Sequence, residues 1–375
     1  MHLKNIHLTQ FKNFSSVQIA LSPEINCFLG NNGSGKTNLL DAVHYLCLTK
    51  SAVNAIDLQN IMHGHSFFAI KGEFQKKAKS VEIKCIVEAG KKKQLINNGK
   101  AYDKMSEHVG ELPVVLIGPD DTQLIKGGSE ERRKFFDGML AQLDRQYLEN
   151  LIRYQHFWKQ RNALIKKFAE TDRVDTILLE PYNEELIHLS QAIARKRAEF
   201  LESYAPLLVR HYVEISGIQE DVRIRYETHC LEQNFPGRFR SSLKKDLFLK
   251  RTSLGTHKDD FVFDIAGYPL KRFGSQGQQK SFLIALKLAQ FHTLKDQKQT
   301  VPILLLDDIF DKLDDQRIKN LVALVARKEF GQLFITDARP ERSRTILRDI
   351  NSNISFFEVA AGQIRIFSDD GYRGH

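Results

Sequence analysis

A glycine-rich loop of eight residues is the strongest constraint on how this chain folds. The segment Gly30-Asn31-Asn32-Gly33-Ser34-Gly35-Lys36-Thr37 matches the pattern G-x-x-x-x-G-K-[ST]. Residues 25–29 before it predict a short buried strand, and residues 38–48 after it predict a helix with one apolar side. A strand, such a turn and a helix in this order surround a phosphate with backbone N–H groups and the positive end of the helix. The loop therefore predicts a nucleoside triphosphate site on an α/β fold.

Two side chains of the loop carry specific expectations. Lys36 is expected to reach the β- and γ-phosphates, and the hydroxyl of Thr37 is expected to help hold Mg²⁺. The assignment implies ATP and Mg²⁺ as cofactors. The nucleotide-binding residues that we predict in this segment are Gly30, Asn31, Asn32, Gly33, Ser34, Gly35, Lys36, Thr37 and Asn38.

A second segment, far downstream, carries the other half of the expected site. Residues 303–306 are four consecutive aliphatic residues, as expected for a central parallel strand covered on both faces, and Asp307-Asp308 follow them. We expect Asp307 to hold Mg²⁺ together with Thr37, and Asp308 to polarise the attacking water, so that Asp308 and Lys36 are the catalytic residues. A solvated strand end has the same pattern, but the phosphate loop favours the functional interpretation.

The region between these two segments differs in composition and in the periodicity of its apolar residues. Residues 139–180 contain neither Gly nor Pro. One predicted helix face is formed by Phe136, Leu140, Leu143, Tyr147, Leu151, Tyr154 and Trp158, which recur at steps of three and four. A second helical run is expected to end before Pro206, with Pro181 near its first turn or at a kink. Two long helices joined around residues 170–175 predict an antiparallel arm; a compact helical subdomain folded onto the head is the alternative.

The α/β texture returns near residue 220, where apolar and polar residues alternate again. We therefore expect an α/β nucleotide-binding head, a mixed sheet with flanking helices, that is interrupted by the helical arm. The expected division is an N-terminal lobe at residues 1–120, the helical insert at 121–219 and the rest of the head at 220–375.

A glycine- and serine-containing turn precedes the helix predicted at 278–290. Its residues Ser275, Gln276, Gly277 and Gln278 offer a hydroxyl and an unobstructed backbone at a helix N-terminus, which is a second anion site. Followed by the paired-aspartate strand, this turn resembles the signature sequence of the ATP-binding-cassette (ABC) superfamily. In that superfamily the signature contacts the γ-phosphate held by the opposite subunit, so the resemblance implies that ATP joins two heads.

The chain as a whole resembles the RecF family of bacterial recombination mediators, in the structural-maintenance-of-chromosomes (SMC) branch of that superfamily. Besides the segments above, the resemblance rests on residues 8–14, 119–121, 125–127, 131–137, 255–260 and 285–289. It implies an ATP-dependent homodimer with weak, DNA-stimulated ATPase activity. The implied partners are single-stranded and gapped double-stranded DNA, with RecR and RecO assisting the loading of RecA.

The resemblance also implies further site residues, and the chain departs from it in places. Lys12 and Asn13 are expected beside the base and phosphates, and Gln123 at Mg²⁺, although an exposed loop glutamine is the alternative. Asp308 stands where the superfamily has Glu, so we expect slow hydrolysis. Thr336-Asp337 occupies the place of the superfamily histidine, and Asp337 either substitutes for it or caps a helix. His257 either touches nucleotide or orders the two lobes.

The net charge of +9 and the pI near 9.2 suggest a polyanionic partner. Two basic clusters are candidates for phosphate contact, with solvated lysine-rich loops as the alternative. One is Lys91-Lys92-Lys93, and the other is Arg238, Arg240, Lys244, Lys245, Lys250 and Arg251, interleaved with Phe239 and Phe248. No base-reading module is visible, so we expect binding selective for DNA structure rather than DNA sequence.

Three other functions remain open from the sequence. A transporter ATPase subunit shares the loop and the signature, but no apolar run approaches the ~18 residues of a membrane helix. Another SMC-like head, partnered with a nuclease, and a DNA clamp without meaningful turnover are the second and third. The N-terminus has no signal-peptide core and the cysteines have no metal-binding spacing, so we expect a cytoplasmic, nucleoid-associated protein without a membrane partner.

Overall fold

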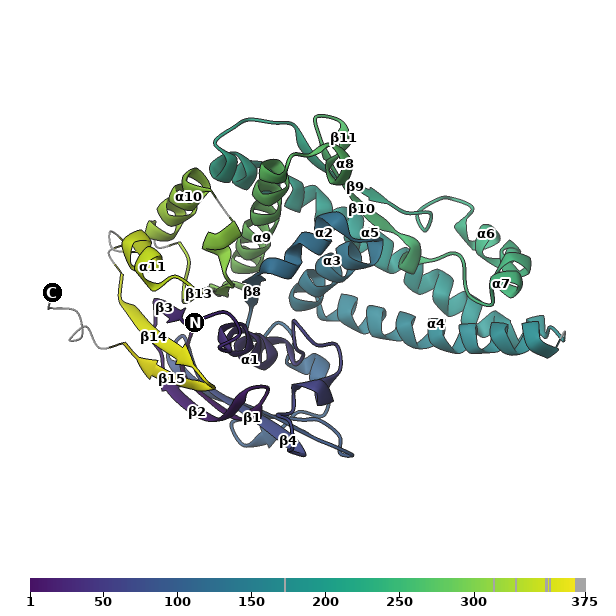
Figure 1. Ribbon diagram of the computed structural model, residues 1–375. Coiled ribbons are helices and arrows are strands. Elements are labelled where there is room, and N and C mark those ends of the chain that lie inside the picture. The colour runs from purple at the N-terminus through teal and green to yellow at the C-terminus, as the bar shows by residue number, and fades with distance from the viewer. Residues whose placement is uncertain (172, 313, 328, 348–349, 351, 368–375) are drawn as a thin grey trace, which may run out of the picture. The chain divides into compact units, whose positions relative to one another are not determined.

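The structure is a computed structural model that describes residues 1–171, 173–312, 314–327, 329–347, 350 and 352–367. The chain divides into two compact units (Figure 1). Unit 1 comprises residues 1–121, 214–216 and 286–375, and unit 2 comprises residues 122–213 and 217–285. Within the described residues, no helix combines the length and the apolar character that crossing a membrane requires.

The first sheet of unit 1 is antiparallel and belongs to the N-terminal part of the chain. Its strands follow the order β2 (Phe14–Ala20), β1 (His2–Phe11), β4 (Phe67–Lys76), β5 (Lys79–Glu88), β6 (Gln94–Asn97) and β7 (Lys100–Ala101). The predicted turn between the last two strands is present, with Asn97 paired to Lys100. Asn98 and Gly99 both have positive φ, 47° and 81°, as the favoured two-residue hairpin turn requires.

The second sheet of unit 1 carries the predicted central strands. Its order is β15 (Gln363–Ile366), β14 (Ile354–Ala360), β3 (Ile25–Leu29), β13 (Leu333–Asp337), β12 (Ile303–Leu306) and β8 (Val114–Ile117). All pairs are parallel except β14 with β15. Every residue of β3, β12 and β13 is buried, which explains why apolar residues predominate in these strands.

Helix α1 (Lys36–Leu48) follows β3 and supplies the core of unit 1. The predicted apolar side of this helix, Leu39, Leu40, Val43 and Leu46, is at most 1% exposed. One continuous buried cluster joins these residues to side chains from both sheets, including Phe68 of β4 and Phe334 of β13. The helix that begins at the phosphate loop is therefore anchored on two sides. Unit 1 also contains α10 (Asp315–Ala326) and α11 (Pro340–Leu347).

Unit 2 contains the predicted helical arm. Helices α4 (Arg145–Thr171) and α5 (Thr176–Ser216) run antiparallel, since Tyr147 lies against Arg197 at one end and Arg161 against Asn183 nearer the other. At 1.5 Å per residue these helices are about 40 Å and about 60 Å long. Asp175 caps the start of α5 by accepting a hydrogen bond from Leu178 N at 3.0 Å.

Two details of the predicted arm were wrong. The face expected to be continuous from Phe136 to Trp158 breaks at Asp144, which separates α3 (Ser129–Leu143) from α4. Asp144 is extended, and its carboxylate accepts a hydrogen bond from Tyr147 N at 3.0 Å, as an N-cap does. Pro206 does not end the second helix either. The buried face of α5 continues past it through Tyr212, and the helix ends at Ser216, followed by the capping Gly217, whose φ is 70°.

The remainder of unit 2 includes a three-stranded antiparallel sheet with the order β11 (Tyr268–Pro269), β10 (Asp260–Ile265) and β9 (Val222–Glu227). The expected boundary at residue 220 does not coincide with the observed one, because this sheet packs on α3 rather than joining the sheets of unit 1. The rings of Phe136 and Phe261 stack at 4.0 Å between centroids. The other helices are α2 (Gln123–Lys126), α6 (Phe235–Ser241), α7 (Leu243–Leu249), α8 (Leu270–Phe273) and α9 (Gln276–Lys298), which continues into unit 1.

Candidate nucleotide-binding site

The predicted phosphate loop connects β3 to α1 in unit 1. Gly33 and Gly35 have φ of 81° and 113°, which only glycine adopts easily. A Cβ on Gly35 would also collide with the side-chain amide of Asn13. The Lys36 ammonium group donates to the carbonyls of Gly30 and Asn31, at 2.8 and 3.1 Å. Its positive charge is therefore held against the loop.

A cavity of about 300 Å³ opens beside this loop. It brings together residues from the two segments that the sequence singled out and one from the loop after β8. The lining residues are Asn32, Gly33, Gly35, Lys36, Thr37, Asn38, Pro119 and Asp308. The predicted juxtaposition of the phosphate loop with the paired aspartates is thus present in unit 1.

The hydroxyl of Thr37 lies directly against the Asp307 carboxylate. Thr37 Oγ1 is 3.1 Å from Oδ1 and 2.9 Å from Oδ2. Two neighbouring ligands of an octahedral Mg²⁺, each at about 2.0–2.1 Å, stand about 2.9 Å apart, so this pair fits the ion. Among the described residues no group of three His, Cys, Asp or Glu side chains is arranged to hold a metal. A site of two protein oxygens is typical of Mg²⁺ bound together with substrate phosphates and water.

Thr336, at the end of β13, is a site residue whose role the sequence did not indicate. Its Oγ1 donates to Asp307 Oδ1 at 2.7 Å and accepts from Asp308 N at 2.9 Å. These contacts arise because β13 lies between β3 and β12 in the sheet. Only the strand order reveals them, since the sequence marked Thr336 solely as a departure from the superfamily.

Asp308 occupies an unusual backbone conformation on the cavity wall, with φ of 46°. Left-handed conformations of residues other than glycine are uncommon and are found at functional sites. The hydrogen bond from its N–H to Thr336 secures this conformation. Asp307 contacts Thr37 and Thr336, whereas Asp308 lines the cavity, so the two adjacent carboxylates have different surroundings.

Asp337 caps a helix, which is the second of the two roles that the sequence left open for it. Its carboxylate accepts hydrogen bonds from Arg339 N at 3.1 Å and from the Ser343 hydroxyl at 2.6 Å. Ser343 belongs to α11, and a negative charge at a helix start is favourable. Asp337 is therefore a structural anchor for α11, and it is buried.

Lys12 and Asn13 stand in different positions relative to the loop. Lys12 is not on the cavity wall; its Nζ forms an ion pair with Asp41 at 2.7 Å, and both side chains are at most 8% exposed. Asn13 connects the loop to α1, because its amide donates to Ser34 O at 3.0 Å and accepts from Asn38 at 2.7 Å. The structure thus places Asn13 behind the phosphate loop as a support.

The predicted signature residues lie in unit 2, at the start of α9. Ser275 and Gln278 cap the helix reciprocally: Ser275 N donates to Gln278 Oε1 at 2.8 Å, and Gln278 N donates to Ser275 Oγ at 3.2 Å. Ser275 and Gln276 are exposed, and Gly277 is partly exposed. Gln123 is also in unit 2, where it is exposed as the first residue of α2.

His257 belongs to a hydrogen-bonded layer inside unit 2. Its Nδ1 lies 2.6 Å from the Tyr154 hydroxyl and its Nε2 lies 3.0 Å from Thr252 O. Burial lowers the pKa of His257 to about 4, so the ring is neutral at pH 7. The observed contacts support the structural interpretation of this histidine.

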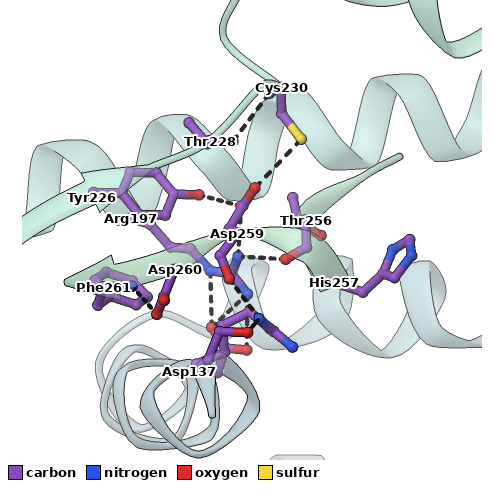
Figure 2. Close-up of polar contacts among 12 residues, drawn as sticks. Asp137, Arg197, Tyr226, Thr228, Cys230, Thr256, His257, Asp259, Asp260 and Phe261 are labelled. Atoms are coloured by element: carbon purple, nitrogen blue, oxygen red, sulfur yellow. Dashed lines mark hydrogen bonds and ion pairs between the residues drawn. The ribbon is translucent and has the colours of Figure 1, made fainter. Parts of the chain in front are cut away.

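Two residues beyond His257, Asp259 belongs to a buried ion cluster around Arg197 (Figure 2). The guanidinium group binds Asp259 at 2.9 Å and both oxygens of Asp137, the nearer at 2.9 Å. Asp259 also accepts from the Tyr226 hydroxyl at 2.5 Å. Burial raises the pKa of Asp259, and Arg197 opposes that shift. The cluster joins α3, α5 and the sheet of unit 2.

The basic clusters separate into paired and unpaired members. Arg238 forms an ion pair with Glu232, and Arg240 with Glu180 at 2.7 Å. In the other cluster, Lys91 pairs with Glu88 and Lys93 is held by Asp57 at 2.8 Å. Within the described part of the chain, no ion pair is formed by the exposed residues Lys244, Lys245, Lys250 and Arg251.

Comparison with known proteins agrees with this geometry. The RecF/RecN/SMC N terminal domain family matches residues 2–362. The DNA replication and repair protein RecF of Flavobacterium johnsoniae is 47% identical over 359 residues, covering 96% of this chain and all of the relative. RecF of Cytophaga hutchinsonii is 46% identical over 364 residues, covering 97% of this chain and 96% of that protein.

Solved structures lead to the same family. The recombination mediator protein RecF-ATP in the RecFOR pathway has a TM-score of 0.87 and 27% identity, and the similarity covers 98% of both chains. An SMC head bound to the C-terminal winged-helix domain of ScpA shares the fold, with a TM-score of 0.57 and 16% identity over 98% of this chain and 97% of that one. The chain therefore belongs to the RecF family of DNA replication and repair proteins and has the ABC/SMC-type ATPase fold.

Proposed function

We propose that this chain is an ATP-controlled DNA-binding protein of recombinational repair and replication-fork maintenance, with weak ATPase activity that DNA stimulates. The observation that carries the proposal is that Lys36 and Thr37 line one cavity, while Asp307, from a segment far along the sequence, contacts the Thr37 hydroxyl. Relatives that are 47% and 46% identical are named DNA replication and repair proteins, which favours this role over a transporter subunit.

The phosphates of ATP bind to the loop from Gly30 to Thr37, where Lys36 compensates their charge. Thr37 and Asp307 would hold Mg²⁺, with Gln123 as a further candidate ligand; the ion would neutralise charge that develops between the β- and γ-phosphates. Asn38 contributes at the start of α1, and Asn13 keeps the loop in place. Lys12, which is paired with Asp41, supports the fold beside the site.

Hydrolysis in this proposal depends on Asp308. Its carboxylate positions the attacking water, and Lys36 stabilises the charge that moves onto the leaving phosphate oxygens. An aspartate is one methylene shorter than the glutamate of the wider superfamily, which is consistent with slow turnover. Slow turnover suits a switch, because the ATP-bound state then persists long enough to act on DNA.

The ATP-bound state is a homodimer in which each nucleotide is shared. The signature residues Ser275, Gln276, Gly277 and Gln278 of one copy contact the γ-phosphate held by the other. The dimer binds single-stranded and gapped double-stranded DNA in the cytoplasm, at the nucleoid. There it assists RecA loading together with RecR and RecO.

The test measures mass by size-exclusion chromatography with light scattering, with and without ATP and gapped DNA. Wild type is expected to double its mass with ATP, and Lys36→Ala to remain monomeric yet folded. Ser275→Arg is expected to bind ATP as a monomer and fail to dimerise, whereas Ser275→Thr, which keeps the cap hydroxyl, dimerises. An ATP-induced dimer of Lys36→Ala would contradict the proposal. Phosphate release with and without gapped DNA distinguishes a slow ATPase from a clamp without turnover.

A further inference from the structure

Helix α7 is held in unit 2 by one face only. Leu243 and Leu247 pack against a small apolar cluster formed by α4 and α5, near the far end of the helical arm (Figure 1). On the same face, the fully buried Asp246 binds Arg161 at 2.8 Å. Positions 244, 245 and 248 therefore lie on the other side of the helix, since residues four apart share a face.

The outward side of α7 carries an aromatic ring among cations. Phe248 is 87% exposed, the highest value among the large apolar residues described as exposed. Lys244 precedes it by one helical turn, and Lys245 by three residues, so both lysines start from the same side of α7 as the ring. A single exposed apolar side chain is common on protein surfaces, so the feature that distinguishes this ring is its place among cations that form no ion pair with any described residue.

Two more cations follow in a rigidly held turn. Lys250 ends α7 with φ of 52°, and Arg251 N donates to Asp246 O at 3.0 Å. Ser253 donates from its N–H and its hydroxyl to the Asp246 carboxylate, at 2.9 and 2.5 Å. The buried aspartate thus organises the turn that presents Lys250 and Arg251 to solvent, and little freedom is lost when a ligand binds.

The charges in this region are close enough to repel one another. Burial, and then Arg251, Arg133 and Lys245, lower the pKa of Lys258. Arg238 and Arg240, by contrast, are neutralised by nearby carboxylates. A protein surface that leaves several like charges near one another unpaired is suited to a ligand with repeated negative charge.

We propose that Lys244, Lys245, Phe248, Lys250 and Arg251 form a contact surface for a single strand of nucleic acid. The four cations bind successive phosphates, and an unstacked base lies on the ring of Phe248. In a duplex both faces of each base are covered, so only a single strand satisfies the ring and the cations together. The inference rests on the proposed function in taking DNA as the ligand, and it assigns a single-strand contact to residues that do not line the nucleotide cavity.

The test uses the full-length protein without nucleotide, so that ATP-dependent dimerisation plays no part. Binding of fluorescein-labelled oligo-dT and of a blunt duplex of equal length is measured by fluorescence anisotropy over a series of salt concentrations. The variants are Phe248→Ala, Phe248→Leu and Phe248→Trp, and a quadruple change of the cations to Ala. Lys100→Ala with Lys104→Ala is the control, since both lysines are exposed in unit 1 and belong to neither basic cluster.

Phe248→Ala and Phe248→Leu are both expected to weaken oligo-dT binding about fivefold or more, and Phe248→Trp to retain it. The quadruple variant is expected to lower affinity strongly and to flatten the salt dependence, by up to about 0.7 in slope for each phosphate that is no longer neutralised. The control variant is expected to bind like wild type.

Three results would overturn the inference. One is wild-type binding of oligo-dT by Phe248→Ala; another is rescue by leucine, which would indicate an aliphatic contact such as a protein partner. The third is an equal loss of duplex binding, which would indicate a general phosphate surface. Any of these leaves the proposed function standing if the variants still form the ATP-dependent dimer on gapped DNA. If wild type binds neither DNA in any nucleotide state, the proposed function and the inference fail together.

Discussion

Thr37 and Asp307 are separated by 270 positions in the chain, yet the threonine hydroxyl lies 2.9 Å from the nearer carboxylate oxygen. Thr37 is at the start of α1 and Asp307 follows β12, so the contact exists only because β3, β13 and β12 are neighbours in one parallel sheet. Thr336 lies on β13, between the strands that lead to Thr37 and Asp307, and it aligns the two aspartates. Five predictions test how this fold is built and used.

Replacing Thr336 tests the alignment of the two aspartates. Thr336→Val removes the hydroxyl that binds Asp307 Oδ1 and Asp308 N while keeping the shape of the side chain. Losing a hydrogen bond to a charged group costs about 1.5–3 kcal/mol, so we expect turnover to fall roughly tenfold to a hundredfold. ATP affinity, measured by fluorescence of a labelled nucleotide, is expected to change much less. Thr336→Ser should restore turnover, and normal turnover in the valine variant would exclude this role.

Replacing Asp308 tests the assignment of the residue that acts on water. Asparagine tolerates positive φ, so Asp308→Asn is expected to keep the local backbone while losing the charge. Phosphate release should fall about a hundredfold or more, as expected for the loss of a general base. The ATP-dependent dimer should form and persist longer than that of wild type, as observed by light scattering over time. A variant that hydrolyses ATP normally would show that another group activates water.

Asp337 is predicted to matter for stability and not for turnover. Asp337→Ala removes the acceptor of hydrogen bonds from Arg339 N and Ser343 Oγ at the start of α11. We expect a loss of about 1–2 kcal/mol in the free energy of unfolding, measured by urea denaturation. Ser343→Ala removes one of the two hydrogen bonds and should cost less. A large loss of turnover in the folded Asp337 variant would instead assign it a catalytic role.

The ion cluster of unit 2 predicts a strong effect on folding. Arg197→Met leaves Asp259 and Asp137 without their cation, and Asp259 is only 3% exposed. Removing one partner of a buried ion pair typically costs about 3–5 kcal/mol, which urea denaturation measures. Arg195→Met, an exposed change two residues earlier, is the matched control and should stay within about 0.5 kcal/mol of wild type. Equal stability of the two variants would contradict the importance of the cluster.

His257 predicts part of the acid sensitivity of the fold. Its folded pKa is about 4 and its unfolded value is about 6.5, so the native state favours the neutral ring. The stability that this preference contributes is present above pH 6.5 and is lost as the pH falls toward 4. Wild type should lose free energy of unfolding between pH 7.5 and pH 5. The His257→Gln variant should lose about 1–2 kcal/mol less over the same range, measured by urea denaturation at both pH values. If the free energy of unfolding changed with pH by the same amount in both proteins, His257 would not contribute to the acid sensitivity.

Local sequence patterns were sufficient to predict the individual strands and the loop that form the site. Strand Ile25–Leu29 and strand Ile303–Leu306 have the predicted bounds, because each is a short, mostly apolar segment in which every residue is buried. The phosphate loop was equally predictable, since its glycines are required by backbone angles and by close approach.

Predictions that depended on a neighbour far along the chain were less successful. The position of Lys12 beside its motif suggested a contact with nucleotide, which stays a prediction, whereas its ion pair with Asp41 was not foreseen. Periodicity also carried the helical face through Asp144, because a side chain that caps the next helix does not interrupt an apolar repeat. Pro206 suggested a helix end, but burial of Tyr204 and Tyr212 on either side keeps the helix continuous.

The amino-acid order alone specified an α/β nucleotide-binding fold, its phosphate loop and its aspartate pair, since each depends on adjacent residues and on short-range backbone preferences. The partners of those residues came only with the folded chain: Thr336 against Asp307, Asn13 behind the loop, and the cations beside Phe248 that no carboxylate among the described residues neutralises. The reason is physical, because a hydrogen bond or an unpaired charge depends on distances that strand order and helix packing set, and neither is encoded in any single stretch of sequence.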